Sequence, residues 1–230
     1  MGYSDITVLH YAIQSQTGLA TYYGPCLMTQ FGENPEVLPY TLDYFKKSII
    51  DEEDAYDIKV SETYTDEILN WFEKKDLERP RQLQKNSKYE WLRNGYAKGM
   101  IVGGAIPSIN HLAGTKYWLD VKDKILLIDI PEGDDISKGL SISNVDAYLA
   151  DLDNLSVFDE ISGIIVGKPY NYSNNENQQL KEILIKYTKD KKYPTLFNVN
   201  VGHVDPIITF SYGDTVEMDS KTNTLRIIRS

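Results

Sequence analysis

Positions 123–130 read DKILLIDI, a short segment that contains a continuous apolar run. An apolar run without alternating polar residues predicts a strand buried on both faces, as in a parallel sheet. Two further runs of this kind follow, ISGIIVG at 161–167 and YPTLFNVN at 193–200. The segments between them, 142–152 and 174–190, have the periodicity of amphipathic helices. Strands that alternate with helices in this way predict βαβ units and therefore an α/β fold.

The sequence on either side of this stretch extends the prediction. GMIVGGA at 99–105 predicts a strand that enters a glycine turn, and 106–114 predicts a short helix. Nearer the N-terminus, LATYYGP at 19–25 predicts a short strand and 40–50 predicts a helix. After the last apolar run, 209–228 predicts an antiparallel hairpin. We therefore expect a parallel-rich sheet with flanking helices and a C-terminal β-hairpin region.

The first residues predict a turn that leads directly into a helix. GYSDITVLHYAI at 2–13 places Ile6, Leu9 and Ile13 on one helical face, which we expect to be buried. Ser4 or Asp5 has the side chain to cap this helix.

The polarity of the chain changes along its length, which suggests three regions. Residues 58–97 form the most polar stretch, have little periodicity and include Trp71 and Trp91. We interpret them as irregular connecting structure. The predicted division is then 1–57, 58–97 and a C-terminal α/β domain at 98–230.

The composition excludes several classes of protein. The 230 residues carry 24 basic and 34 acidic side chains, a net charge of −10, which argues against binding to nucleic acid. A single cysteine rules out a disulfide framework or a cysteine-rich zinc site. The sequence has no apolar run long enough to span a membrane and no signal peptide after Met1. We expect a cytoplasmic protein that does not bind a membrane.

Reactive side chains occur where the predicted strands end. In open α/β sheets, functional groups lie just beyond the carboxyl ends of the strands. The strand at 123–130 ends near Asp129, with Glu132 three residues later, and the last apolar strand leads to His203. Ser4 lies in a Gly-x-Ser turn ahead of a helix. A serine hydroxyl becomes a nucleophile when a histidine takes its proton and a carboxylate orients that histidine, so these residues are candidates for such a site.

Each of these residues also has another interpretation. Ser4 can be a helix cap and Asp129 a turn residue, and Asp129 with Glu132 can form a hydrolytic carboxylate pair that needs no serine. The three histidines lie far apart without a short-spaced partner, so we predict no metal site. Structural roles are expected for the remaining histidines and for the cysteine, as a small buried hydrophobe: His10, His111 and Cys26.

Several of these segments together resemble the LD-carboxypeptidase family of serine peptidases. The stretch GYSDITVLHYAI, followed by TGLATYYGP, is similar to the nucleophile segment of that family. The long segment with tyrosines and tryptophans at 58–97 resembles the branch that contains the microcin C immunity peptidases. The other matching motifs follow in the order of the family: YTLDYFKK (40–47), GMIVGGA (99–105), LAGTKYW (112–118), DKILLID (123–129), ISGIIVGKP (161–169) and NVNVGHVDPIITFSYG (198–213).

The resemblance implies a role for each matching residue. Ser4 would be the nucleophile, His203 the general base and acid, Asp129 the acid that orients the imidazole, and the Asp5 N–H an oxyanion donor. The implied substrate is an L,D-amide in a murein peptide or the amide of a peptidyl- or aminoacyl-nucleotide, with no cofactor. The family also implies a homodimer. The implied substrate-binding positions are Trp71, Trp91, Gly104, Ala105 and Glu132, although packing within the connecting segment is the favoured interpretation for each tryptophan.

Three features differ from the pattern of the family. Its triad acid is Glu, whereas Asp129 is one methylene shorter, so Glu132 is an alternative partner for His203. Ala105 occupies a position where the family usually has a polar side chain that can position substrate. The family also has a half-domain before the serine segment, so we expect this chain to correspond to the nucleophile helix and the C-terminal domain. The alternative function is therefore a catalytically silent binding or interaction module.

Overall fold

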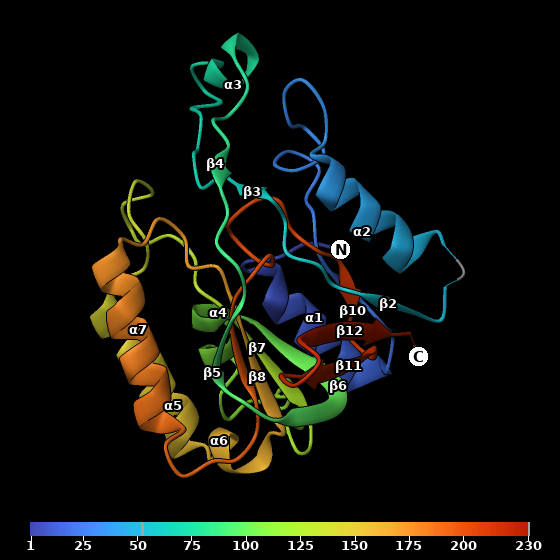
Figure 1. Ribbon diagram of the computed structural model, residues 1–230, viewed down its shortest axis with the longest axis vertical. Coiled ribbons are helices and arrows are strands. Elements are labelled where there is room, and N and C mark those ends of the chain that lie inside the picture. The colour runs from blue at the N-terminus through green and yellow to red at the C-terminus, as the bar shows by residue number, and fades with distance from the viewer. Residues whose placement is uncertain (52, 230) are drawn as a thin grey trace.

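One eight-stranded mixed sheet forms the centre of the protein (Figure 1). The computed structural model describes residues 1–51 and 53–229. Strands β6 to β9 run parallel, and the strands outside them are antiparallel to their neighbours. This arrangement confirms the predicted α/β fold, its parallel strands and the C-terminal hairpin. In sheet order the strands are β2 (Ala55–Asp57), β12 (Thr224–Ile228), β11 (Thr215–Asp219), β6 (Tyr96–Ala105), β7 (Ile125–Asp129), β8 (Gly163–Gly167), β9 (Thr195–Val199) and β5 (Glu90–Arg93).

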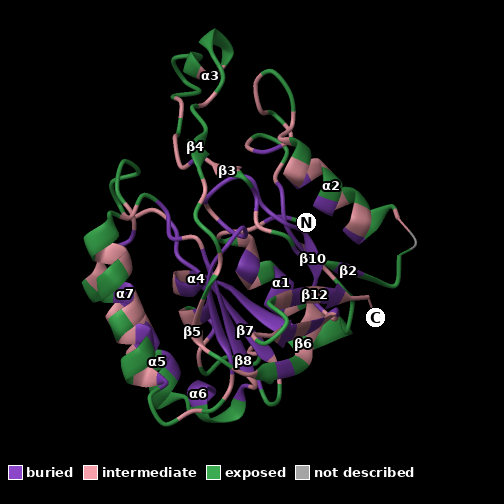
Figure 2. Cartoon of the chain, in the orientation of Figure 1, coloured by how far each residue is buried: buried purple, intermediate pink, exposed green. Residues whose placement is uncertain are grey.

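Strands β7, β8 and β9 are buried at every residue, as their unbroken apolar sequences predict (Figure 2). Successive side chains of a strand point to opposite faces, so both faces of this part of the sheet must be covered. Helices lie along one side of these strands in Figure 1. They are α4 (Ile106–Asn110), α5 (Ile142–Asn154), α6 (Val157–Glu160) and α7 (Asn174–Tyr187), of which α5 and α7 begin with a serine cap.

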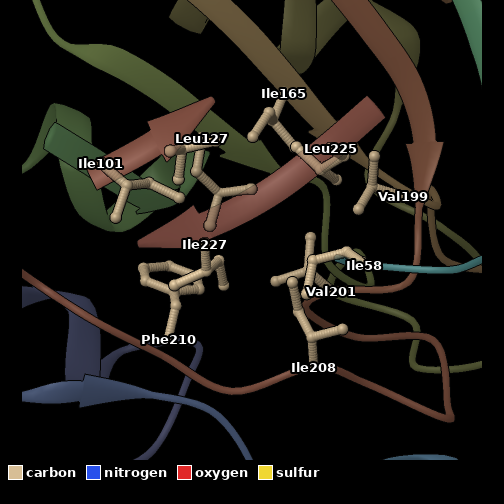
Figure 3. Close-up of a pocket in the computed structure, with 11 residues that line it drawn as sticks. Ile58, Ile101, Leu127, Ile165, Val199, Val201, Ile208, Phe210, Leu225 and Ile227 are labelled. Carbon is tan, nitrogen blue, oxygen red and sulfur yellow. The ribbon is translucent and has the colours of Figure 1, made fainter. Parts of the chain in front are cut away.

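On the other face of the parallel strands, part of the cover comes from the antiparallel strands of the same sheet. The first half of β6 pairs with β11 and its second half with β7, so β11 and β12 extend the sheet beyond its parallel part. Figure 3 shows side chains of β6 to β9 meeting side chains of β12, of β10 (Phe210–Ser211) and of two loops in an apolar cluster. A cavity of only about 10 Å³ remains there, so the cluster is closely packed. The labelled residues are Ile58, Ile101, Leu127, Ile165, Val199, Val201, Ile208, Phe210, Leu225 and Ile227.

Helix α1 (Ile6–Thr17) forms where the sequence predicts it, but with a different face inward. Leu9 is 53% exposed and Ile13 is 37% exposed, whereas the buried residues are Thr7, His10 and Tyr11. The expected apolar face was therefore wrong. The reason is a polar contact with the end of β6, because the Thr7 hydroxyl accepts a hydrogen bond from the Ala105 N–H at 3.2 Å.

The N-terminus of α1 also differs from the prediction. Asp5 is the N-cap residue, but its side chain caps no backbone N–H group of the helix. Its carboxylate instead accepts a hydrogen bond from the Ser108 hydroxyl in α4, at 3.3 Å. The neighbouring Ser4 has a left-handed backbone conformation with a φ of 61°.

Residues 58–97 contain more regular structure than the sequence suggested. A two-stranded sheet of β3 (Thr63–Tyr64) and β4 (Gln84–Lys85) carries the short helix α3 (Lys75–Glu78), and the three project from the body of the protein (Figure 1). The expectation of irregular structure was wrong at β5 and at the start of β6, which belong to the central sheet. The division into three regions stays a prediction.

One helix and a pair of short strands lie on the side of the sheet where the N-terminus is found (Figure 1). Helix α2 (Pro39–Ile49) confirms the helix predicted at 40–50. The short strand β1 (Tyr22–Tyr23) pairs with β10 (Phe210–Ser211), which follows the loop after β9. Of the helices in the described residues, none is both long and apolar enough to cross a bilayer.

Candidate active site

The structure brings Asp129 and His203 together at the carboxyl edge of the parallel strands. Asp129 is the last residue of β7, and His203 lies in the loop that follows β9. The imidazole Nδ1 is 2.7 Å from Asp129 Oδ2, and the backbone N–H of His203 donates to Oδ1 at 3.2 Å. Asp129 is fully buried and the His203 side chain is 5% exposed. The carboxylate thus fixes both the ring and the backbone of His203.

Gly202 makes this close approach possible. Its φ of +96° is unfavourable for residues with a side chain, and a Cβ atom at this position would lie 1.9 Å from Asp129 Oδ1. The loop therefore lies directly against the carboxylate, with no space for any side chain at position 202.

Two properties of the His203 ring matter for its chemistry: its pKa and the hydrogen bonding of its second nitrogen, Nε2. Burial opposes protonation of this ring, but the carboxylate of Asp129, with smaller contributions from Glu132 and Asp205, outweighs it and raises the pKa of His203. Nε2 has no hydrogen-bond partner among the described residues, and its nearest acidic atom is Glu132 Oε2 at 3.8 Å. Asp129 therefore faces Nδ1, whereas Glu132 lies on the side of the free Nε2.

Tyr23 is a third member of this cluster, and the sequence analysis missed it. Its hydroxyl donates to Asp129 Oδ2 at 2.5 Å, and the whole side chain is buried. Burial and the charge of Asp129 raise the pKa of Tyr23 well above its ordinary value, and the nearby backbone of Ser4 offsets part of the rise. The hydroxyl is therefore a neutral donor. No sequence signal singled it out, because β1 is too short to have a pattern.

Ser4 lies close to this cluster but is not hydrogen-bonded to His203. The aromatic ring of Tyr3, its neighbour in the chain, meets the imidazole edge-on with the ring centroids 4.8 Å apart. Within the described part of the chain, no hydrogen bond joins the Ser4 hydroxyl to Nε2, and the Asp5 N–H has no acceptor. The left-handed Ser4 lies two residues before the start of α1 and next to its N-cap residue, which is the geometry of a strained turn before a helix.

The paired glycines of β6 end beside Asp129. Ala105 and Asp129 are register partners in the parallel ladder of β6 and β7. Gly104 has a φ of +142°, and a Cβ there would be 2.6 Å from the Thr7 hydroxyl and 3.1 Å from the ring of Tyr23. The absence of a side chain at Gly104 thus lets α1 and Tyr23 approach the strand.

The two tryptophans lie on separate elements. Trp91 is in β5, where its register partner is Leu196 near the start of β9, and its indole N–H donates to Asn223 at 2.8 Å. Trp71 lies in the turn before α3, on the projecting segment, and is 43% exposed. Among the described residues, neither tryptophan forms a hydrogen bond with Asp129 or His203 or a ring contact with His203.

The other histidines and the cysteine have no place in this cluster. His10 is buried, its Nε2 is 3.1 Å from the Gly2 carbonyl oxygen, and burial lowers its pKa to about 4. His111 is exposed at the end of α4. Cys26 is a free thiol and only half-buried, so its expected burial was wrong. In the described residues, no group of three or more His, Cys, Asp or Glu side chains is arranged to hold a metal ion.

A buried ion cluster holds the chain just after His203. Arg81 on the projecting segment pairs with Asp205 at 2.7 Å and also with Glu33, and these three side chains are at most 17% exposed. Gln30 donates to the carboxylate of Asp205 at 3.0 Å. No pattern in the sequence predicts this cluster, because its members come from three distant segments.

Comparisons with known proteins identify the family of this chain. The family model of the LD-carboxypeptidase C-terminal domain matches residues 98–218, more than half of the chain. The Bacillus subtilis (strain 168) protein YocD, named as a carboxypeptidase, is 33% identical over 98% of this chain and 65% of its own length. The microcin C7 self-immunity protein MccF of Escherichia coli is 31% identical over 99% of this chain and 64% of its own length.

Solved structures extend the likeness to the fold. The MccF-like protein from Bacillus anthracis str. Ames has a TM-score of 0.84 and 32% identity, covering 100% of this chain and 67% of that structure. MccF in complex with glutamyl sulfamoyl guanosine has a TM-score of 0.82 and 29% identity, with the same coverage. The chain spans about 65% of the length of the curated relatives YocD and MccF. Together, the matching family model, these relatives and the shared fold show that the chain belongs to the LD-carboxypeptidase family of serine peptidases, with the microcin C7 self-immunity protein among its relatives.

Proposed function

We propose that this chain carries the chemistry of a serine amide hydrolase, with Ser4 as nucleophile, His203 as general base and acid, and Asp129 as the acid that orients the imidazole. The observation that carries the proposal is the Asp129–His203 pair, in which Nδ1 is bound at 2.7 Å and Nε2 is free. An imidazole held in this way accepts a proton at Nε2 and later returns it to the leaving group. Asp129 performs the orienting role, since Glu132 lies on the side of Nε2.

The turn at Ser4 supplies a further element of this chemistry. In amide hydrolysis the carbonyl oxygen gains negative charge, which backbone N–H groups can stabilise. The Asp5 N–H follows the nucleophile and has no acceptor among the described residues, so it is available for the developing oxyanion. Ser4 Oγ must move within hydrogen-bond distance of Nε2 when the substrate binds, because catalytic hydrogen bonds often tighten only in the complex.

The proposed substrate is an amide in one of two classes of molecule. One is an L,D-amide in a murein peptide, and the other is the amide of an aminoacyl- or peptidyl-nucleotide. The second class is favoured by the solved complexes of MccF with glutamyl sulfamoyl guanosine and aspartyl sulfamoyl adenosine. Trp71 is exposed enough to stack on a base, whereas the indole N–H of Trp91 is already bound to Asn223. Gly104, Ala105 and Glu132 border the site as further substrate contacts, and we propose a homodimer.

A second function has specific support. The missing hydrogen bond between Ser4 and His203, together with the apolar Ala105 beside Asp129, favours a catalytically silent module that binds such a ligand without cleaving it. This function would use the same site but would need no activated serine.

One experiment separates the two functions. The purified chain and its Ser4→Ala variant are incubated with a murein tetrapeptide and, separately, with an aminoacyl sulfamoyl-adenylate, and the products are followed by mass spectrometry. Cleavage that disappears in the variant supports the hydrolase and identifies the substrate class. Cleavage that persists in the variant excludes Ser4 as nucleophile. If neither amide is cleaved, labelling of Ser4 by a serine-directed phosphonate tests whether the hydroxyl is activated; no labelling of a folded sample favours the silent module.

A further inference from the structure

The buried hydroxyl of Tyr23 has no part in the mechanism proposed above. Tyr23 is held on several sides: β1 pairs with β10, its ring stacks on Phe210 at 5.5 Å, and the ring of Tyr212 meets it edge-on at 6.4 Å. The side chain is completely buried, so neither water nor a change of rotamer can easily replace its contact with Asp129.

The carboxylate of Asp129 accepts hydrogen bonds from three donors. Oδ1 accepts the backbone N–H of His203, whereas Oδ2 accepts both the Tyr23 hydroxyl at 2.5 Å and the His203 Nδ1–H at 2.7 Å. Tyr23 and the imidazole therefore bind the same oxygen. Such donors stabilise a charged carboxylate in a buried position and restrict its rotation.

We propose that Tyr23 is a positioning residue of the active site, whose hydroxyl fixes the Asp129 carboxylate and shares with His203 the oxygen that orients the imidazole. This inference rests on the proposed function for its catalytic meaning, but the contact itself does not depend on it. Two elements that are distant in sequence, β1 and β7, are thereby joined at the atom that holds His203.

The shared oxygen has a consequence that can be measured on His203. A second donor draws electron density from Oδ2, so the imidazolium is held less strongly than by a carboxylate with no such donor. Tyr23→Phe removes the hydroxyl but keeps the ring that stacks on Phe210. The other groups that face His203 remain unchanged, namely Asp129, Glu132, Asp205 and the ring of Tyr3. The variant should therefore bind a proton on His203 more tightly.

The test is an NMR titration of the imidazole resonances in the full chain and in two variants. The three histidines are assigned by single His→Gln substitutions. We expect Tyr23→Phe to raise the titration midpoint of His203 by about half a pH unit or more, equivalent to at least about a threefold tighter proton. Tyr22→Phe is the matched control, because Tyr22 is the neighbouring residue of β1 and is only half-buried; it should leave the midpoint unchanged. An unchanged or lowered midpoint in Tyr23→Phe would overturn the proposal.

A second measurement covers the case in which Tyr23→Phe does not fold. In the unmodified protein, the Tyr23 hydroxyl proton should exchange slowly with water and show a nuclear Overhauser effect to the Nδ1–H of His203. Its absence under conditions where the Nδ1–H is itself observed would equally overturn the proposal.

Activity measurements then separate this inference from the proposed function. If the chain hydrolyses either amide, Tyr23→Phe should lower kcat by about tenfold, leave KM nearly unchanged and move the acidic limb of the pH profile upward with the titration midpoint. A Tyr23→Phe enzyme with unchanged kcat and pH profile refutes the positioning role. If the unmodified chain hydrolyses neither amide, the proposed function fails, and the NMR titration still decides whether Tyr23 controls Asp129 and His203.

Discussion

Replacing Gly202 by alanine tests whether the loop carrying His203 really lies against the Asp129 carboxylate. An alanine at a φ of +96° introduces backbone strain of about 1–3 kcal/mol. Its Cβ would also be 1.9 Å from Asp129 Oδ1, so the loop or the carboxylate must move. Losing one hydrogen bond to a buried charge removes a further 1.5–3 kcal/mol, roughly. We expect a total destabilisation of about 2.5–6 kcal/mol.

The matched control is Gly18→Ala. Gly18 also has a positive φ, of +69°, but a Cβ there meets nothing within 4 Å, so the variant suffers only the backbone strain of about 1–2 kcal/mol. For a chain of this size, each kcal/mol lowers Tm by about 2–4 °C. In thermal unfolding followed by circular dichroism, we therefore expect Tm to fall by about 5–24 °C for Gly202→Ala and by only about 2–8 °C for Gly18→Ala. Equal losses in the two variants would show that the loop does not contact the carboxylate as described.

Two other predictions concern buried charges. Burial lowers the pKa of His10 to about 4, from about 6.5 in the unfolded chain, so stability should be lost as the pH falls from about 7 to 4, by about 3 kcal/mol in total from this residue. Urea unfolding at both pH values should show a smaller loss in His10→Gln, and an equal loss in both proteins would contradict the assignment. Arg81→Met should destabilise the protein by about 3–5 kcal/mol, because it leaves Asp205 and Glu33 buried without their cation. The control Arg226→Met breaks an exposed ion pair and should leave Tm nearly unchanged, so similar losses in the two variants would exclude a special role for the buried cluster.

The sequence predicts those parts of the fold in which the local pattern of apolar residues matches the burial of the segment in the folded protein. The apolar runs of β7, β8 and β9 contain no alternation, and each is buried at every residue. The approach of Asp129 to His203 followed from topology alone, because parallel strands end at the same edge of a sheet.

The errors arose where tertiary contacts override a local pattern. In α1 the pattern indicated that Leu9 and Ile13 face inward, but the hydrogen bond between Thr7 and Ala105 turns another face toward the sheet. The contribution of Tyr23 could not be predicted, since a two-residue strand has no periodicity and its partner is more than a hundred residues away. The buried cluster around Arg81 was missed for the same reason, because its members are close only in the folded chain.

The three donors around Asp129 also bear on the order of events during folding. Tyr23 lies near the start of the chain and His203 near its end, whereas β7 lies in the middle and pairs with β6 and β8, the strands that precede and follow it in sequence. A carboxylate buried without partners is strongly unfavourable, so the end of β7 must stay hydrated until both flanking segments arrive. Contacts of such long sequence separation form slowly. We therefore expect the Asp129 carboxylate to lose its water only in the last step of folding. The Asp129–His203 site and the native fold should then form in the same step.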